Sequence, residues 1–273
     1  MLLAGGLGAL VGTVLGLTGA GGGILAVPAL VLGLGFAMAQ ANPVALVAVA
    51  LAAMLGALDG LRKGLVRYKA AALMAVFGSL SAPIGIVIGR AANEAWLMSV
   101  FSAVMFLVAW RMYRQGRFQA DVAGASDTMA AHPKPCQVSP ATGRFVWNFK
   151  TFATLASIGV SSGIMTGMLG VGGGFIIVPA LRQFSNVSMH GIVATSLMVV
   201  ALVSGTTVAT AVWAGARIPE LAWPFIAFAT FGMLVGRSAT SHVSTSLLQR
   251  IFGVVAALVA VLMLTKTYTG LLA

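Results

Sequence analysis

The residues of this chain whose spacing points most clearly to chemistry are glycines, and the same pattern occurs twice. Gly19-Ala-Gly-Gly-Gly23 is followed by Pro28, and Gly170-Val-Gly-Gly-Gly174 is followed by Pro179. The two motifs lie 151 residues apart, from 19 to 170. Each glycine destabilises a helix by about 1 kcal/mol relative to alanine. We therefore expect each motif to interrupt a helix and to leave backbone N–H groups without intrahelical partners.

Free backbone N–H groups at the start of a helix bind anions, because they carry the positive end of the helix dipole. Two such helix starts near the middle of a membrane would hold a small oxyanion without lysine or arginine. Close packing between helices is the alternative role for such glycines. A nucleotide-binding loop is excluded, because Gly-x-Gly-x-x-Gly fails in both motifs. The predicted substrate-binding residues are Gly21, Gly22, Gly23, Ile24, Gly172, Gly173, Gly174 and Phe175.

Two hydroxyl residues, Thr195 and Ser196, lie early in a long apolar run. They are predicted to donate hydrogen bonds to the ligand, with bonding to their own helix as the alternative. An offset of 147 residues matches them to Ala48 and Val49, so a hydroxyl site here would be asymmetric.

Arg90 and Arg237 each follow a Gly-x-x-x-Gly sequence at the end of an apolar run. This shared context predicts equivalent positions in the two halves of the chain. The arginines would attract anions at the two mouths of a pathway, or alternatively extend to the membrane interface.

Catalytic and metal chemistry are not expected. The five carboxylates lie outside the centres of the apolar runs, and the three histidines lie near run ends or in a polar linker. We predict no catalytic residue, no metal and no cofactor, since no nucleophile–base pair is present. Cys136, the single cysteine, is expected to be a free thiol in the linker.

The composition places the chain in a bilayer. Hydrophobic residues make up 59% of it and charged residues 8%, whereas soluble proteins carry about 25% charged residues. The net charge of +11 comes mostly from basic residues at the ends of apolar runs. That placement follows the positive-inside rule and does not indicate nucleic-acid binding. The apolar runs are Pro43–Leu58, Ala70–Gly89, Ala95–Trp110, Val187–Ala214, Leu221–Gly236 and Leu247–Leu264.

The segments that contain the glycine motifs are too long for single crossings. Leu2–Gln40 would measure about 58 Å as one helix, whereas the hydrocarbon core is about 30 Å thick. We therefore expect a glycine-turned hairpin here, and another at Trp147–Asn186. The predicted fold is an all-α polytopic membrane protein of two homologous halves, each a hairpin plus three membrane helices. The expected parts are a first repeat at 1–115, a cytoplasmic linker at 116–149 and a second repeat at 150–273.

A hairpin returns the chain to its starting side, so three further spans would insert the second half upside down. This inverted arrangement puts Arg182 and Arg237 on the same side as Arg62–Lys69, and Lys266 on the other. A parallel arrangement, with each hairpin as one broken span, reverses these placements. The positive-inside count differs by a single residue between the two, so charge alone hardly decides.

At the repeated Gly-x-Gly-Gly-Gly-x-x-x-x-Pro-x-Leu the chain resembles the TauE/SafE family of sulfite exporters and toluene-sulfonate uptake permeases. Ala194-Thr-Ser-Leu197 is also similar to the family's second-half pattern, from which Val47-Ala-Val-Ala50 departs. The resemblance covers nearly the whole chain apart from the linker. It implies a multi-pass transporter of the bacterial inner membrane that exports sulfite, sulfoacetate or another organosulfonate.

The expected partners are a small anion and the lipid bilayer, and the expected mechanism is alternating access. A passive anion channel and an uptake permease for another small organic anion are the alternatives. The sequence leaves open the substrate, direction, coupling ion and oligomeric state, a homodimer included.

Overall fold

The protein is all-helical in the computed structural model, which describes residues 1–122, 136, 145–216, 218–239 and 245–272. These residues form ten α-helices and no sheet, as the composition predicts. Most of the expected linker, and Arg217, lie outside the described residues. The elements are α1 Leu2–Thr18, η1 Gly19–Leu25, α2 Ala26–Pro28, η2 Ala29–Gly33, α3 Met38–Arg62, α4 Tyr68–Ala91, α5 Glu94–Val122, α6 Phe149–Leu169, α7 Gly174–Phe184, α8 Met189–Trp213, α9 Ala222–Ala239 and α10 Thr245–Leu272.

Five helices in the described part of the chain are long and apolar enough to cross a bilayer. They comprise α3, α4, α6, α8 and the Glu94–Arg111 part of α5. Shorter apolar helices occupy Leu2–Thr18, Gly21–Gly33, Gly174–Phe184 and Ile251–Lys266. The chain is therefore a multi-pass membrane protein.

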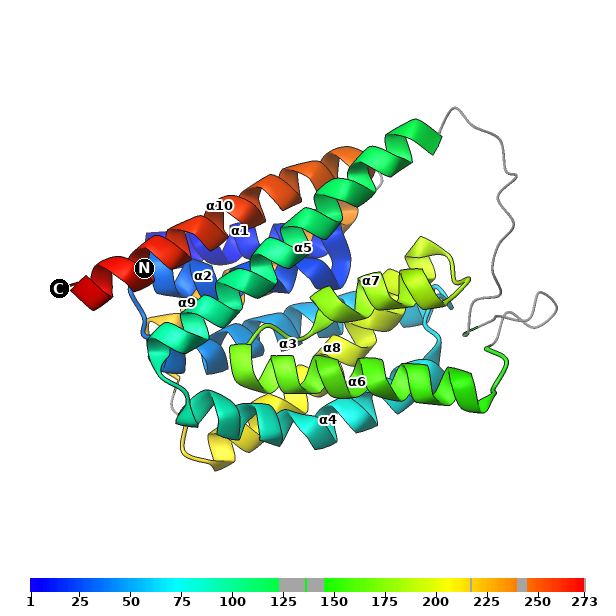
Figure 1. The fold of residues 1–273 in the computed structure, drawn as a ribbon, viewed down its shortest axis with the longest axis horizontal. Helices are drawn as coiled ribbons and strands as arrows, with labels where there is room; N and C mark the ends of the chain where they lie inside the picture. Colours follow the sequence, from blue (N-terminus) through cyan, green and yellow to red (C-terminus); the bar gives the residue numbers. More distant parts are fainter. Residues whose placement is uncertain (123–135, 137–144, 217, 240–244, 273) are drawn as a thin grey trace.

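The helices pack mainly in pairs that join the first part of the chain to the last (Figure 1). Helix α1 packs on α9, and α6 packs on α4. Helices α3 and α8 pack on each other between these two pairs, and α5 packs on α10 across one face.

Glycines allow the α1–α9 and α4–α6 pairs to approach closely. A methyl group placed on Gly12 would lie 1.9 Å from the carbonyl oxygen of Ala229. One placed on Gly163 would lie 2.1 Å from the carbonyl oxygen of Gly78. Such small-residue contacts are typical of membrane helices. The glycines spaced by four residues in α1 and α6 are therefore packing residues.

Both expected helical hairpins are present. In the first, Gly33 returns to α1, where a methyl group on it would touch Leu7 at 2.4 Å. In the second, Phe184 at the end of α7 accepts a backbone hydrogen bond from Cys136 (3.0 Å). The Cys136 thiol in turn interacts with Thr154 near the start of α6.

Two features of the expected linker differ in the structure. Helix α5 continues to Val122, past the expected linker start at 116. Cys136 is a free cysteine, as predicted, but it is buried and forms an isolated bridge with Ser185. Burial raises the pKa of the Cys136 thiol. The linker thiol is therefore packed inside the protein.

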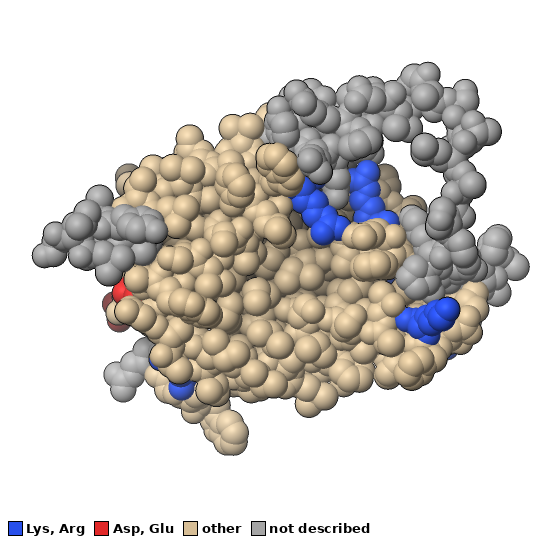
Figure 2. Space-filling view, in the orientation of Figure 1, with Lys and Arg blue, Asp and Glu red and all other residues tan. Residues whose placement is uncertain are grey.

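Basic residues gather at one end of the helix bundle. Figure 2 shows most of the visible Lys and Arg side chains toward one end and acidic ones at the other. Arg237 pairs with Asp59, which also pairs with Lys63 (2.6 and 3.0 Å). Arg111 bonds Gln183, next to Arg182. At the other end, Lys266 donates to the carbonyl of Val31 (3.0 Å).

Every tryptophan of the chain is exposed and lies near an end of an apolar helix or segment. Tryptophan favours the membrane–water interface because its ring is apolar and its N–H is polar. The placement therefore marks two interface levels across the bundle. The residues are Trp96, Trp110, Trp147, Trp213 and Trp223.

Candidate functional site

The first glycine break is a change of helix type. Helix α1 ends at Thr18, and Gly19 has φ 74° and ψ −141°. Residues Gly19–Leu25 then wind as a 3-10 helix, followed by one α turn and a π turn that ends at Gly33. The chain therefore stays helical after Gly19, but mostly as 3-10 and π turns instead of a regular α-helix. A methyl group on Gly22 would lie 2.5 Å from Leu15 Cα, so glycine is needed for this tight return.

The second glycine break is an open loop. Helix α6 ends at Leu169, and Gly170 adopts the left-handed conformation that favours glycine. Gly172 and Gly173 also have positive φ values of 73° and 63°. Helix α7 then begins at Gly174 with no side-chain cap. This confirms the predicted helix start after the second motif.

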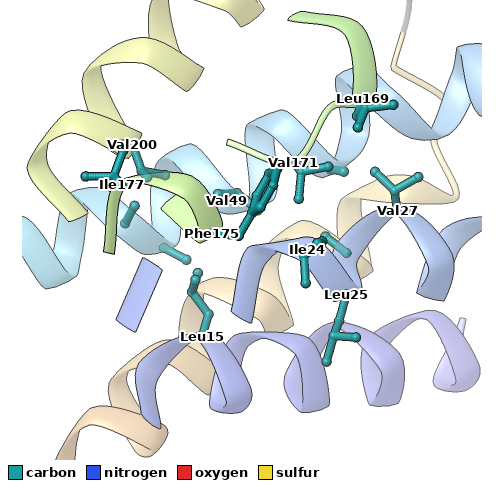
Figure 3. Packing of buried hydrophobic residues seen from close by; sticks show 14 of the residues in the cluster. Leu15, Ile24, Leu25, Val27, Val49, Leu169, Val171, Phe175, Ile177 and Val200 are labelled. Atoms are coloured by element: carbon teal, nitrogen blue, oxygen red, sulfur yellow. The ribbon is translucent and has the colours of Figure 1, made fainter. Parts of the chain in front are cut away.

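The two breaks meet at the middle of the central helices. A methyl group on Gly23 would lie 3.2 Å from the carbonyl oxygen of Val171 and 3.3 Å from Val49 in α3. Gly172 faces Val49 and Val200, the latter in α8. Figure 3 shows apolar side chains from both breaks and both central helices lying together. The predicted residues Gly21, Gly22, Gly23, Ile24, Gly172, Gly173, Gly174 and Phe175 are all buried.

Four polar side chains lie at the second break, Ser162, Thr166, Ser204 and Asn42, and of these the sequence indicates only Ser204, as a weaker candidate. Thr166 Oγ1 already donates to the carbonyl of Ser162 (2.7 Å). Methyl groups on Gly172 and Gly173 would lie 3.0 Å from Ser204 Oγ and 2.0 Å from Ser162 Oγ. Neither hydroxyl has a hydrogen-bond partner. An unpaired buried polar group costs about 1–3 kcal/mol. These hydroxyls are therefore available to a ligand at the break.

Asn42 contacts the same break from α3. Its Nδ2 donates to the carbonyl oxygen of Met168 at the end of α6 (3.2 Å). Its Oδ1 lies 2.9 Å from where a methyl group on Gly170 would be, and has no partner. Asn42 lies inside α3, one residue before Pro43, and does not cap the helix.

The first break is apolar where the second is polar. A methyl group on Gly19 would lie 2.5 Å from Cγ1 of Val193 in α8, whereas the corresponding contact of Gly170 is with Asn42. Among the atoms nearest to Gly19, Gly22 and Gly23, the one hydroxyl oxygen is that of Thr18, beside Gly22. Its Oγ1 already donates to the carbonyl of Val14 (2.7 Å).

The structure places Thr195 and Ser196 toward the basic end of α8. Thr195 Oγ1 accepts a hydrogen bond from the backbone N–H of Arg67 (3.0 Å). Ser196 Oγ donates to the carbonyl of Val193 in its own helix (2.9 Å). Both hydroxyls are buried, and both are engaged within the protein.

Arg90 and Arg237 have different surroundings. Arg90 is exposed and donates to the carbonyl of Ala214 (3.3 Å). Arg237 forms the ion pair with Asp59, which links α9 to α3.

Their expected equivalence is wrong, because the packing follows an offset of 151 residues. Gly85 meets the carbonyl of Ile164, and Gly236 meets that of Thr13. Both the glycines and their partners are 151 apart, whereas the two arginines are 147 apart. The same offset matches Ser196 to Ala45 instead of Val49.

Within the described residues, no group of three or more His, Cys, Asp or Glu side chains is placed to hold a metal ion. Asp59, Glu94 and Glu220 lie in terminal helix turns or in the turn before α9.

Comparison with known proteins identifies the family. The family model described as "Sulfite exporter TauE/SafE" matches residues 4–263. Two proteins described as "Probable membrane transporter protein", from Xylella fastidiosa strains Temecula1 and 9a5c, are each 30% identical over 277 residues. Each alignment covers 98% of this chain and 96% of the relative. No solved structure matches the chain.

The apolar helices identify a membrane protein, and the family-model match over residues 4–263 identifies its family. The chain belongs to the TauE/SafE sulfite exporter family. It is a membrane transporter, as the glycine motifs predicted, and not an enzyme, as the lack of a nucleophile–base pair predicted.

Proposed function

We propose that this protein moves a small sulfur-containing oxyanion, such as sulfite or an organosulfonate, out of the bacterial cytoplasm across the inner membrane. The observation that carries the proposal is the contact between Gly23 and Val171, which joins the two breaks midway along the central helices. The family description and the resemblance of both motifs support the substrate class.

The chemistry of the breaks suits an anion. Helix α7 begins in glycines with no side-chain cap, so its first N–H groups are open to a negatively charged ligand. The carboxylates whose side chains are described, Asp59, Glu94 and Glu220, lie in terminal helix turns or in the turn before α9, so none repels an anion there. Neutral donors hold an anion without the strong Coulomb attraction that would slow its release.

We further propose that the halves 1–115 and 150–273 are inverted repeats. Exchange of the halves converts the α1–α9 pair into α6–α4, and it leaves the pairs α3–α8 and α5–α10 unchanged. Arg182 and Arg237 also lie at the same end as Arg62–Lys69, with Lys266 at the opposite end, as the inverted arrangement requires. By the positive-inside rule this basic end faces the cytoplasm.

Alternating access would then be a movement of the α1–α9 and α4–α6 pairs about the central helices. Each outer pair is locked by glycine contacts to backbone, such as Gly12 to Ala229 and Gly163 to Gly78. We therefore expect each pair to move as one body. The breaks lie between the pairs, where such a movement would open the site to one side at a time.

The test is uptake of radiolabelled sulfite and taurine-like sulfonates into proteoliposomes that contain the purified protein. A carrier gives saturable flux and counterflow from preloaded vesicles. Gly172→Ala should remove the flux, because Gly172 has a positive φ and faces Ser204 and two valines. Gly205→Ala is the matched control, since a methyl group there meets nothing within 4 Å.

Absence of flux for every oxyanion, with the protein folded and inserted, would contradict the proposal. Flux without saturation or counterflow, at rates far above carrier turnover, would indicate the channel instead.

A further inference from the structure

We propose that the oxyanion is bound at the second glycine break alone, between the first N–H groups of α7 and the hydroxyls of Ser162 and Ser204. The first break would supply only an apolar wall. This inference rests on the proposed function and adds to it the residues that hold the ligand.

The first step is that these two hydroxyls stand apart from the other buried ones. Ten serine and threonine side chains are buried among the described residues. Eight have hydrogen-bond partners, and the two that lack them are Ser162 and Ser204. The partnered ones are Ser81, Ser102, Thr151, Thr166, Ser185, Thr195, Ser196 and Thr207.

The second step is where they lie. Ser162 and Ser204 are both 0% exposed, and they come from different helices, α6 and α8. Yet they face adjacent glycines, Gly173 and Gly172, directly before the start of α7. The uncapped first N–H groups of α7 and the two unpartnered serine hydroxyls are thus hydrogen-bond donors that lack an acceptor. An oxyanion provides several acceptor atoms at once.

The third step is the sign of the ligand's charge. Serine hydroxyls also accept, so they can bind a cation or water. A cation, however, would be repelled by the positive end of α7, and no described carboxylate lies beside the break to offset this. Donation to an anion is therefore the role that the surroundings favour.

The fourth step is the contrast with the first break. At the offset of 151 residues, Ser162 and Ser204 correspond to Val11 and Ala53, neither of which carries a hydrogen-bonding side chain. Val193 replaces Asn42 in the same way. The first break would therefore contact the uncharged part of a ligand, such as the methyl group of methanesulfonate.

The test is a titration of the purified wild-type chain in detergent with sulfite and with methanesulfonate, by calorimetry and by thermal shift. We expect Ser162→Ala and Ser204→Ala each to weaken both affinities about tenfold, the loss of one hydrogen bond to a charged group. Ser102→Ala is the control. Its buried hydroxyl bonds its own helix in α5 (2.8 Å), so binding should not change.

Folding is checked by size-exclusion chromatography and by the melting temperature without ligand. Should an alanine variant fail to fold, Ser162→Cys and Ser204→Cys fill the same position with a slightly larger group that is a much weaker donor, and they should show the same loss. Removing an unpartnered hydroxyl is otherwise expected to preserve or raise the melting temperature.

The outcomes separate this inference from the function on which it rests. Wild-type binding that survives both serine substitutions would overturn the second-break site and leave the proposed function intact. No binding of either anion by the folded wild type would count against the proposed function itself. Stabilisation by sodium chloride relative to choline chloride, lost in the serine variants, would replace the anion by a cation and overturn the inference.

Discussion

The two glycine breaks share a sequence pattern but differ in backbone and in lining. The first break, at Gly19–Leu25, stays wound as a 3-10 helix and has one positive-φ glycine, Gly19. The second break, at Gly170–Gly173, opens into a loop with three. Valines line both breaks. The first break adds only the hydroxyl of Thr18, which already has a partner, whereas the second adds two unpartnered hydroxyls and an amide. Two similar glycine patterns can therefore have different roles, because the side chains around each break come from other helices.

The strongest expected effect is from Gly173→Ala at the second break. The left-handed conformation costs about 1–2 kcal/mol for alanine. A methyl group would in addition lie 2.0 Å from Ser162 Oγ and 2.7 Å from its backbone oxygen. We expect the free energy of unfolding to fall by about 3 kcal/mol or more, and anion flux to be lost. Thermal unfolding in detergent measures this change. A melting temperature for the variant equal to that of the wild type would show that the break is not rigid.

A smaller effect is expected from Asn42→Leu, which makes the second break resemble the first. Loss of the bond from Nδ2 leaves the carbonyl of Met168 unpaired, at about 1–3 kcal/mol. The melting temperature should fall and flux should decrease. Gln40→Leu, at an exposed site of the same helix, is the control. Equal effects at both sites would remove any special role for Asn42.

Gly23→Ala tests the first break and should be mild. Its φ is not positive, and a methyl group would meet Val171 O and Val49 at 3.2 and 3.3 Å, where a shift of a few tenths of an ångström suffices. We expect a stability loss below about 1 kcal/mol and flux that is reduced but measurable. If this variant were as damaged as Gly173→Ala, the two breaks would be equally constrained.

The weakest effect is expected from Thr18→Val, which removes the hydroxyl beside Gly22. That hydroxyl already bonds the carbonyl of Val14, so it is not available to a ligand. Flux and sulfite affinity should stay at wild-type values, with a stability change within about 1 kcal/mol. Loss of sulfite binding would move the ligand to the first break.

Periodicity and length were sufficient to predict most of the fold. The uninterrupted apolar runs became α3, α4, α5, α8, α9 and α10, because a bilayer requires every backbone group to be bonded within its own helix. Both hairpins followed from segments too long for one crossing. The 3-10 and π turns after Gly19 were not predictable, since they depend on how closely Leu15 approaches Gly22.

The candidate site was predictable only in its backbone. Three adjacent glycines are a local signal, so the positions of both breaks could be read directly. Ser162 carries no such signal, because serine in a membrane helix usually bonds its own backbone, as Ser196 does. The offset of 151 residues pairs Asn42 with Val193 and so singles out Asn42, whereas the offset of 147 does not.

Local chemistry alone thus determined that this chain lies in a membrane, turns twice at glycines and offers amide groups there, because these properties depend on neighbours along the chain. Tertiary structure decided which helices face those turns. It placed Ser204 and Asn42 beside the second turn and Val193 beside the first, and it paired Arg237 with Asp59. Such contacts join residues more than a hundred positions apart, so they depend on how the helices dock and not on any local pattern.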